Sequence, residues 1–244
     1  MIMERDVYHK TAAIENIHWW FIGRRFIVEQ ILNELLLSKN AEILEMGCGT
    51  GGNLPLLAKF GNVYGVELDD TAREYARKRE IGTILPGSLP DEIPLAGQLF
   101  DLIVMTDVLE HVGEDQVALE RLYQRLKLGG YILITVPAFP ALWSRHDDLH
   151  HHKRRYTIER LRTILINAGY NIIRVSYINC IMFPVISGVR MMQRFLGMAD
   201  ADDLKVYPPV INRMLAGLFS GEGHLLKFVS LPFGLSLLCV GRKV

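Results

Sequence analysis

The chain has 244 residues, and half of them are hydrophobic, which suffices for one sizeable α/β domain. Its 27 basic residues balance 27 acidic ones, and this zero net charge argues against a dedicated nucleic-acid binder. Its three cysteines are widely spaced and form no C-x-x-C pair, which favours a reducing compartment and gives no zinc knuckle. The N-terminus has no apolar signal region, and the apolar stretch 175–198 is interrupted by Pro184, Arg190 and Arg194, so we expect a cytoplasmic protein without a membrane-spanning helix.

Two amphipathic segments, 11–21 and 24–38, predict helices at the start of the chain, and we interpret residues 1–40 as a helical cap. Strand-like runs then alternate with helical ones over 41–244. The predicted strands are Ile43–Met46, Val63–Glu67, Thr83–Leu85, Phe100–Met105, Tyr131–Val136, Tyr170–Ser176 and Leu235–Val240. The predicted helices between them are Leu54–Phe60, Thr71–Arg79, Glu114–Leu126 and Thr157–Ala168. This alternation predicts a parallel sheet covered by helices on both faces.

A long insertion, about 180–232, separates the last two predicted strands and contains two helix-like segments, PVISGVRMMQRFLG and VINRMLAGLF. An insertion of this length on an otherwise economical fold is often a functional lid, with simple packing or a dimer contact as the alternatives. In the first segment Val185 and Met192 lie on one face and Arg190 and Arg194 on another. Because helices of this kind can lie in a membrane interface, we expect peripheral membrane contact through this insertion.

The segment EILEMGCGTGGN, residues 42–53, predicts a strand that runs into a glycine turn and a helix. Gly47, Gly49 and Gly51 allow close approach of a ligand to the backbone, and the helix start offers free N–H groups. Glu67, at the end of the next strand, could accept hydrogen bonds from two ribose hydroxyls. Both features indicate an adenosine nucleoside, but they leave nicotinamide and S-adenosylmethionine cofactors open.

Two later segments are more specific. GSLPDEIPLAGQLFDLIVMTDVLEHV, from Gly87 to Val112, and LKLGGYILITVP, from Leu126 to Pro137, resemble class I S-adenosylmethionine-dependent methyltransferases, in the broad branch that includes ubiquinone-biosynthesis O-methyltransferases. The resemblance covers 42–137 and continues more loosely through RRYTIERLRTILINAGY. It implies a Rossmann-like seven-stranded α/β sheet in the order 3-2-1-4-5-7-6 with strand 7 antiparallel, and S-adenosyl-L-methionine as cofactor.

The resemblance also implies cofactor contacts at matching positions. Glu45, Gly47, Gly49 and Gly51 would surround the methionine part of the cofactor, and Glu67 would hold the ribose.

The adenine and the reactive sulfonium would be bordered by residues from later strand ends. Leu68 would pack on the adenine, and Ser88 and Leu89 match adenine-contacting positions. Relatives carry aspartate where this chain has Ser88, so the hydrogen bond to the adenine amino group is not carried over. Thr106 and Asp107 would border the sulfonium.

The N-terminal segment ENIHWWFIGRR is expected to cap this pocket. Trp19, Trp20 and Phe21 cannot all face one core, because adjacent helix positions are about 100° apart. We therefore expect Trp19 and Trp20 to contact the acceptor, with packing in the core as the alternative. Arg24 or Arg25 could pair with the methionine carboxylate of the cofactor.

Methyl transfer to a hydroxyl requires an aligned acceptor and a base that removes its proton. His111 is the first candidate for this catalytic base and His152 the second. His111 could equally be a structural residue at a helix start.

The run SRHDDLHHHKRRY, residues 144–156, follows the fifth strand at the ligand-binding edge of the sheet. His152, Arg155 and Tyr156 match a His-x-Arg-Arg-Tyr element of similar methyltransferases, where the loop faces the acceptor. We expect Arg155 and Tyr156 to bind the substrate, with Arg155 able to fix an anionic group. Four basic residues in a neutral chain make a nucleic-acid surface the weaker interpretation.

A metal is a further alternative. Asp107-x-x-Glu110-His111, with a histidine of the downstream run, resembles the ligand set of some divalent-metal-dependent relatives. Those relatives carry glutamate where this chain has Asp107, and Leu-Glu-His-Val also occurs in relatives without metal. We expect no metal.

The sequence as a whole predicts an S-adenosylmethionine-dependent methyltransferase that acts on oxygen of a small or lipid-linked acceptor, with no nucleic-acid partner. Two other classes stay open. One is a regulatory or partner protein that binds S-adenosylmethionine without turnover, since a fold does not settle a function. The other is an NAD-dependent oxidoreductase, against which the segments after Gly87 argue.

Overall fold

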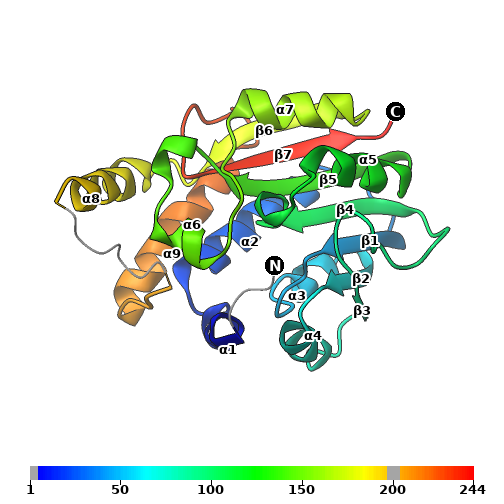
Figure 1. Cartoon of the computed structure of the whole chain (residues 1–244), viewed down its shortest axis with the longest axis horizontal. Coiled ribbons are helices and arrows are strands. Elements are labelled where there is room, and N and C mark those ends of the chain that lie inside the picture. Colours follow the sequence, from blue (N-terminus) through cyan, green and yellow to red (C-terminus); the bar gives the residue numbers. More distant parts are fainter. Residues whose placement is uncertain (1–4, 197–203) are drawn as a thin grey trace.

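The computed structural model describes residues 5–196 and 204–244, and in this part of the chain seven strands form one sheet (Figure 1). The strands are β1 (Ala41–Met46), β2 (Gly61–Glu67), β3 (Thr83–Pro86), β4 (Phe100–Thr106), β5 (Leu126–Pro137), β6 (Asn171–Ile178) and β7 (Ser236–Arg242). Their order is β3-β2-β1-β4-β5-β7-β6, with β7 antiparallel to β5 and β6 and the other pairs parallel. The predicted sheet order and the antiparallel seventh strand are confirmed.

Helices cover both faces of this sheet. They are α1 (Arg5–Ile14), α2 (Trp19–Leu32), α3 (Leu54–Leu57), α4 (Asp70–Arg77), α5 (Asp115–Gln124), α6 (Arg145–Leu149), α7 (Ile158–Asn167), α8 (Phe183–Leu196) and α9 (Pro209–Leu225), with short 3₁₀ turns η1 (Leu109–His111) and η2 (Pro140–Leu142). In Figure 1, α5 and α7 lie along β7 and β5, α2 and α9 run together on the other side, and α8 projects from the body. Among the described residues, no helix combines the length and the apolar character needed to cross a membrane.

Alternating residues of the central strands explain why both faces are covered. Ile43 and Leu102 point into a core cluster with α2, α3 and α9, whereas their neighbours Leu44 and Ile103 point into a second cluster with α5 and α7. Successive strand residues point to opposite faces, so a strand buried on both sides reads as a continuous apolar run. This explains why the strand positions could be recognised in the sequence.

The N-terminal helices differ from the prediction in their bounds. The His18 side chain accepts a hydrogen bond from the backbone N–H of Trp20 at 3.3 Å, so α2 begins at Trp19, five residues before the expected start. Ile27 and Ile31 of α2 are fully buried in the same core cluster as the sheet, where α2 packs against α9. This helix is therefore part of the main core. The division of the chain at residue 40 stays a prediction.

The insertion between β6 and β7 contains α8 and α9, at the positions that the sequence indicated. Residues 197–203 and the side chain of Arg194 lie outside the described part, so the predicted basic face of α8 is described only in part, through Arg190. The loop after α5 also differs from expectation, because β5 begins at Leu126, where its edge pairs with Phe100 of β4.

Candidate functional site

A cavity of about 480 Å³ lies at the carboxyl ends of the parallel strands, within the range of small-molecule sites. Its walls come from the glycine turn after β1, the end of β2, the end of β4, helix α2 and the histidine-rich run after β5. Fourteen predicted site residues line it: Trp19, Trp20, Arg24, Gly47, Gly49, Glu67, Leu68, Ser88, Leu89, Thr106, Asp107, His111, His152 and Arg155. Segments far apart in the sequence therefore converge on one pocket.

The glycine turn approaches the pocket in a conformation that other residues rarely adopt. Gly47 and Gly49 have φ angles of +66° and +54°, and a Cβ built on Gly49 would meet no atom within 4 Å. The Gly49 N–H donates to Glu67 Oε2 at 2.9 Å, and the Asp69 N–H donates to Glu67 Oε1 at 3.0 Å. These bonds fix the Glu67 carboxylate beside the turn, where it could still accept from a ligand hydroxyl. Burial raises the pKa of Glu67, opposed by these backbone hydrogen bonds.

Glu45 and Gly51, both predicted to contact the cofactor, do not line the cavity. Glu45 is fully buried, and its carboxyl accepts a hydrogen bond at 2.7 Å from the Asn53 amide, which also donates to Thr106 Oγ1 at 2.9 Å. Burial raises the pKa of Glu45 to about 7, with the Asn53 hydrogen bond acting in the opposite direction. A Cβ on Gly51 would meet side chains of Leu54 and Arg79 at 2.8 and 2.9 Å, so this glycine allows packing beneath the turn.

The three residues predicted to contact adenine, Leu68, Ser88 and Leu89, all line the cavity. Leu68 is 42% exposed and presents an apolar surface to the cavity, next to Ser88 and Leu89. The Ser88 hydroxyl donates to Glu92 at 3.1 Å. This local bond gives the Ser88 hydroxyl a protein partner at the position where relatives carry an aspartate.

Arg24 and Asp107, two predicted cofactor residues, form an ion pair with each other. Asp107 also accepts a hydrogen bond at 3.0 Å from the Thr135 hydroxyl of β5. Arg25, the alternative partner for a cofactor carboxylate, donates to the backbone carbonyl of Glu15 at 2.6 Å. The Arg24–Asp107 pair therefore joins α2 to the end of β4 at the centre of the cavity wall.

The aromatic residues of α2 serve both the core and the pocket. Trp19 and Trp20 line the cavity, and both pack against Phe219 of α9, with ring centroids 6.0 and 5.1 Å from the Phe219 ring. Trp19 is buried, and Trp20 is partly exposed. Each tryptophan thus has a core side and a cavity side, and their contact with the acceptor stays a prediction.

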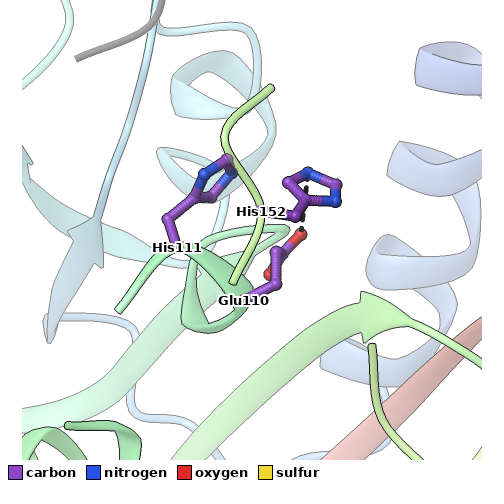
Figure 2. A group of neighbouring side chains, drawn as sticks. All are labelled: Glu110, His111 and His152. Carbon is purple, nitrogen blue, oxygen red and sulfur yellow. Dashed lines mark ion pairs between the residues drawn. The ribbon is translucent and has the colours of Figure 1, made fainter. Parts of the chain in front are cut away.

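The two histidine candidates lie next to each other in the cavity wall. The rings of His111 and His152 are perpendicular at 4.7 Å between centroids, and His152 Nε2 lies 4.0 Å from Glu110 Oε1 (Figure 2). Burial, with neighbouring His152 and His150, lowers the pKa of His111 to about 3, so its imidazole is neutral at physiological pH. Glu110 is completely buried, and neither of its carboxyl oxygens has a hydrogen-bond partner among the described residues. Burial, reinforced by the nearby charge of Asp107, raises the pKa of Glu110 well above its ordinary value.

Among the described side chains, one ligand atom from each of Glu110, His111 and His152 lies within 4.8 Å of the others, a spacing that could admit a cation. Burial raises the pKa of Glu110 and so disfavours the carboxylate form that a cation ligand requires. The expectation that no metal is needed stays a prediction, tested below with a chelator.

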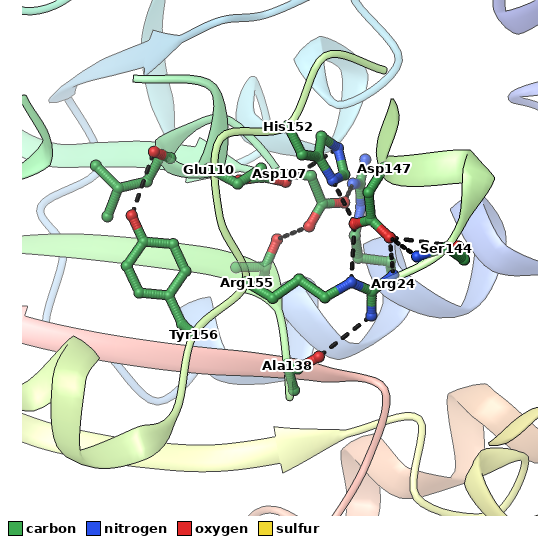
Figure 3. Close-up of polar contacts among 11 residues, drawn as sticks. Arg24, Asp107, Glu110, Ala138, Ser144, Asp147, His152, Arg155 and Tyr156 are labelled. Carbon is green, nitrogen blue, oxygen red and sulfur yellow. Dashed lines mark hydrogen bonds and ion pairs between the residues drawn. The ribbon is translucent and has the colours of Figure 1, made fainter. Parts of the chain in front are cut away.

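Asp147 organises the histidine-rich run (Figure 3). Its side chain is completely buried and accepts two hydrogen bonds of 2.8 Å from the Arg155 guanidinium. It also accepts a hydrogen bond of 2.8 Å from the backbone N–H of Ser144, and its Oδ1 lies 2.8 Å from His152 Nδ1. Arg155 also donates to the Ala138 carbonyl at 3.2 Å. Its guanidinium, predicted to bind substrate, therefore already holds the loop together.

Tyr156, the other predicted substrate residue, does not line the cavity. Its ring is completely buried, and its hydroxyl donates to Asp115 at 3.0 Å (Figure 3 shows the ring directed away from Asp147). Arg154 pairs with the same Asp115 at 2.6 Å. The Arg-Arg-Tyr part of the run thus anchors the loop to α5 and to Asp147, and we assign it a structural position.

Sequence reasoning missed Asp147 and Asn53 as organisers of the site. Ser144-x-x-Asp147 has the spacing of a capping box, whose fourth residue bonds back to the first N–H, and this local signal could have singled out Asp147. Asn53 follows the glycine turn directly, but its role depends on Thr106 in another strand. No spacing rule connects those two positions.

The comparisons agree with this architecture. A family model described as a methyltransferase domain matches residues 21–175, so the chain belongs to that family. A Mycobacterium tuberculosis protein named "Probable S-adenosylmethionine-dependent methyltransferase" is 27% identical over 64% of this chain and 57% of its own length. The ubiquinone biosynthesis O-methyltransferase of Rickettsia canadensis is 29% identical over 47% of this chain and 50% of its own. The chain thus spans little more than half the length of the curated relatives it matches.

Solved structures show the same fold. A chain in complex with the Trm112 methyltransferase activator of Haloferax volcanii superposes with a TM-score of 0.63 at 16% identity, covering 100% of this chain and 99% of that one. Phosphoethanolamine N-methyltransferase 2 of Haemonchus contortus, in complex with S-adenosyl-L-methionine, gives 0.57 at 18% identity, covering 87% and 51%. The domain is a class I S-adenosylmethionine-dependent methyltransferase domain, which corrects the NAD-dependent alternative.

The residues present fit this cofactor. Open space above Gly49 leaves room for the methionine part, the Glu67 carboxylate is held where it could accept from ribose hydroxyls, and Leu68 offers an apolar face to the adenine. When bound, S-adenosyl-L-methionine would supply an electrophilic methyl group.

Proposed function

We propose that this protein transfers a methyl group from S-adenosyl-L-methionine to an oxygen atom of a small or lipid-linked acceptor. The observation that carries the oxygen assignment is the pair of imidazoles on the cavity wall. His111, whose pKa burial lowers to about 3, lies next to His152 on the face that borders Asp107 and the end of β4. A hydroxyl must lose its proton on methylation, and a base in reach of it contributes about 10²–10⁴-fold to the rate.

The acceptor half of the cavity supports a flat or apolar substrate. Trp19 and Trp20 supply rigid apolar surface, and Ile186, Arg190 and Leu204 of the insertion add to the lining. Aromatic walls of this kind bind planar groups with little loss of conformational entropy. A phenolic acceptor would satisfy both the aromatic wall and the nearby bases.

The lipid part of the proposal is supported by the outer surface of the insertion. Large apolar side chains are exposed along α8, α9 and the segment after α9: Val185, Met191, Met192, Leu196, Val210, Met214, Leu225, Phe228 and Val229. Large exposed apolar patches are uncommon on soluble monomers and mark interaction sites, so the gathering of these side chains on the insertion supports a contact there. Since Ile186, Arg190 and Leu204 also line the cavity, an acceptor with an apolar tail could pass from this surface into the site.

The test of the reaction begins with calorimetric titration of S-adenosylhomocysteine alongside NAD. Tight binding of the former alone is expected. Transfer of labelled methyl groups is then measured to matched acceptors, a catechol and its aniline counterpart, each with and without an alkyl chain. Methylation of the catechol in preference to the aniline supports oxygen as the acceptor. Binding without any transfer would favour a regulatory protein without turnover.

The membrane part is tested by flotation with liposomes that contain anionic lipid. Replacing Val210 and Phe228 by serine is expected to abolish binding, because both are largely exposed on the insertion. The matched control replaces Leu36 and Leu128, equally exposed but outside the insertion, and should bind like the unaltered protein. Failure of the intact protein to float with liposomes would contradict membrane contact.

A further inference from the structure

The Asp147 carboxylate and the His152 ring lie in direct contact at the edge of the cavity, and nothing in the family comparison assigns Asp147 a role. His152 Nδ1 is 2.8 Å from Asp147 Oδ1, while the opposite ring nitrogen, Nε2, faces Glu110 at 4.0 Å. The His152 side chain is only 7% exposed. Its orientation is therefore set by protein contacts on both edges of the ring.

The hydrogen bonds to Asp147 favour its ionised form. Burial alone would raise its pKa, but the hydrogen bonds from His152 and Arg155 outweigh burial and hold the pKa below its ordinary value. The bidentate bond from Arg155 supplies two N–H donors in one plane, the strongest arrangement for a buried carboxylate. An ionised carboxylate can only accept hydrogen bonds.

This constraint decides the tautomer of His152. Because Asp147 offers only acceptor atoms, the ring nitrogen that faces it, Nδ1, must carry the proton. In the neutral imidazole Nε2 is then unprotonated and is the basic atom. It points to the side where Glu110 and His111 border the cavity (Figures 2 and 3).

We propose that Asp147 is a positioning residue that fixes His152 with Nδ1–H toward its carboxylate, so that Nε2 serves as the general base for the acceptor hydroxyl. The role of Nε2 as a base rests on the proposed function, whereas the tautomer of His152 does not. In the step, the acceptor O–H bond breaks and its proton passes to Nε2. The oxygen forms a bond to the methyl carbon while the carbon–sulfur bond breaks, with its electron pair remaining on sulfur. The imidazolium, stabilised by Asp147, later returns the proton to water.

Other titratable and charged groups surround His152. They are Asp147, His150 and Arg155 from the same run, Glu110 and His111 from η1, and Asp107 with its partner Arg24 from the end of β4 and α2. His111 is neutral, and its pKa of about 3 keeps it out of a titration above pH 5.

The structural half is tested without any acceptor. In protein labelled with ¹⁵N-histidine, long-range ¹H–¹⁵N spectra report which ring nitrogen carries the proton, with the signals assigned by His152→Gln. We expect the Nδ1–H tautomer in the unaltered protein and its loss in Asp147→Asn. Asp148→Asn is the matched control, since Asp148 is exposed and accepts its 2.9 Å side-chain hydrogen bond from Trp143. An Nε2–H tautomer in the unaltered protein would overturn the proposal even if Asp147→Asn does not fold.

The catalytic half uses catechol and S-adenosyl-L-methionine with a labelled methyl group. Asp147→Asn and His152→Ala are each expected to lower kcat by about 10²–10⁴-fold, with little change in S-adenosylhomocysteine affinity. The double variant should be no slower than His152→Ala, because Asp147 acts through His152. If the losses of kcat in the two single variants multiply in the double variant, Asp147 does not act through His152. Lack of turnover by the unaltered protein would count against the proposed function and leave the spectra to decide the tautomer.

Discussion

Replacing Gly49 by alanine separates the cost of backbone strain from the loss of cofactor binding, because the chain contains a matched control. Gly49 and Gly97 have φ angles of +54° and +83°, and a Cβ built on either meets no atom within 4 Å. Gly49 lines the cavity, whereas Gly97 lies in an exposed turn outside it. The two substitutions therefore impose similar strain but differ in what the added methyl group faces.

The strain is the left-handed backbone conformation, which costs a residue with a Cβ about 1–2 kcal/mol. Both variants should lose about that much free energy of unfolding, which for a chain of this size lowers Tm by roughly 2–8 °C. Only Gly49→Ala places a methyl group where the methionine part of the cofactor is expected. Overpacking of a filled site costs about 1–3 kcal/mol, so its affinity for S-adenosylhomocysteine should fall by about 5–150-fold.

Calorimetric titration and thermal unfolding of both variants provide the assay. Gly97→Ala should bind S-adenosylhomocysteine as the unaltered protein does, despite its lower Tm. If Gly49→Ala also binds normally, the cofactor does not pass over this turn, and the placement of the methionine part is wrong. If both variants lose affinity equally, the effect is one of stability and carries no information about the site.

Three further predictions address the core, the buried acids and the metal question. Gly23→Ala should destabilise the fold by about 1–3 kcal/mol in urea unfolding, because its Cβ would lie 2.8 Å from Cγ of Phe219 where α2 crosses α9; an unchanged midpoint would contradict that packing. Burial raises the pKa of Glu45 from 4.5 to about 7, so between these pH values the folded protein keeps a proton that the unfolded chain releases. The free energy of unfolding therefore falls as pH rises from about 4.5 to 7. Glu45→Gln cannot ionise and should remove up to about 3 kcal/mol of that fall, as measured by urea unfolding at pH 5, 6, 7 and 8; an identical slope in both proteins would refute the assignment. Extensive dialysis against a chelator should leave methyl transfer unchanged, and loss of activity that Mg²⁺, Mn²⁺ or Zn²⁺ restores would assign Glu110, His111 and His152 to a metal instead.

Much of the fold was predictable because the strands are buried on both faces. Runs such as Leu102–Met105 are apolar at successive positions, so the strand can be recognised regardless of which helix covers it. The order of the strands could not be obtained in this way. It came from the resemblance of particular segments to a known family, since periodicity carries no information about which strands pair.

The ends of elements were less predictable because tertiary contacts set them. Leu126–Gly130 has glycines that suggest a turn, yet it extends β5 because Leu126 pairs with Phe100 and Gly129 bonds to Lys243. The start of α2 was missed for a similar reason. His18 is an uncommon N-cap residue, so the sequence did not indicate that Trp19 begins the helix.

The positions of the site residues were largely predictable, whereas their partners were not. Fourteen of the seventeen candidate site residues line one cavity, because the carboxyl ends of parallel strands meet at one edge of the sheet. Pairing depends on contacts between distant segments: Arg24 and Asp107 are 83 residues apart, and no local pattern predicts that they neutralise each other. A residue's type and strand position thus predicted that it would line the cavity but did not predict which other residues would hydrogen-bond or pair with it.

The histidine-rich run shows why this distinction matters for function. Its composition suggested a basic surface, a metal site or a substrate clamp, and all three interpretations assumed that its charged side chains are available to a ligand. In the structure, Arg154 and Arg155 are paired with Asp115 and Asp147. These pairs anchor the loop, so neither guanidinium is available as an unpaired charge for a ligand. A short run with this much charge is therefore better explained as a rigid support for one correctly oriented imidazole than as a binding surface.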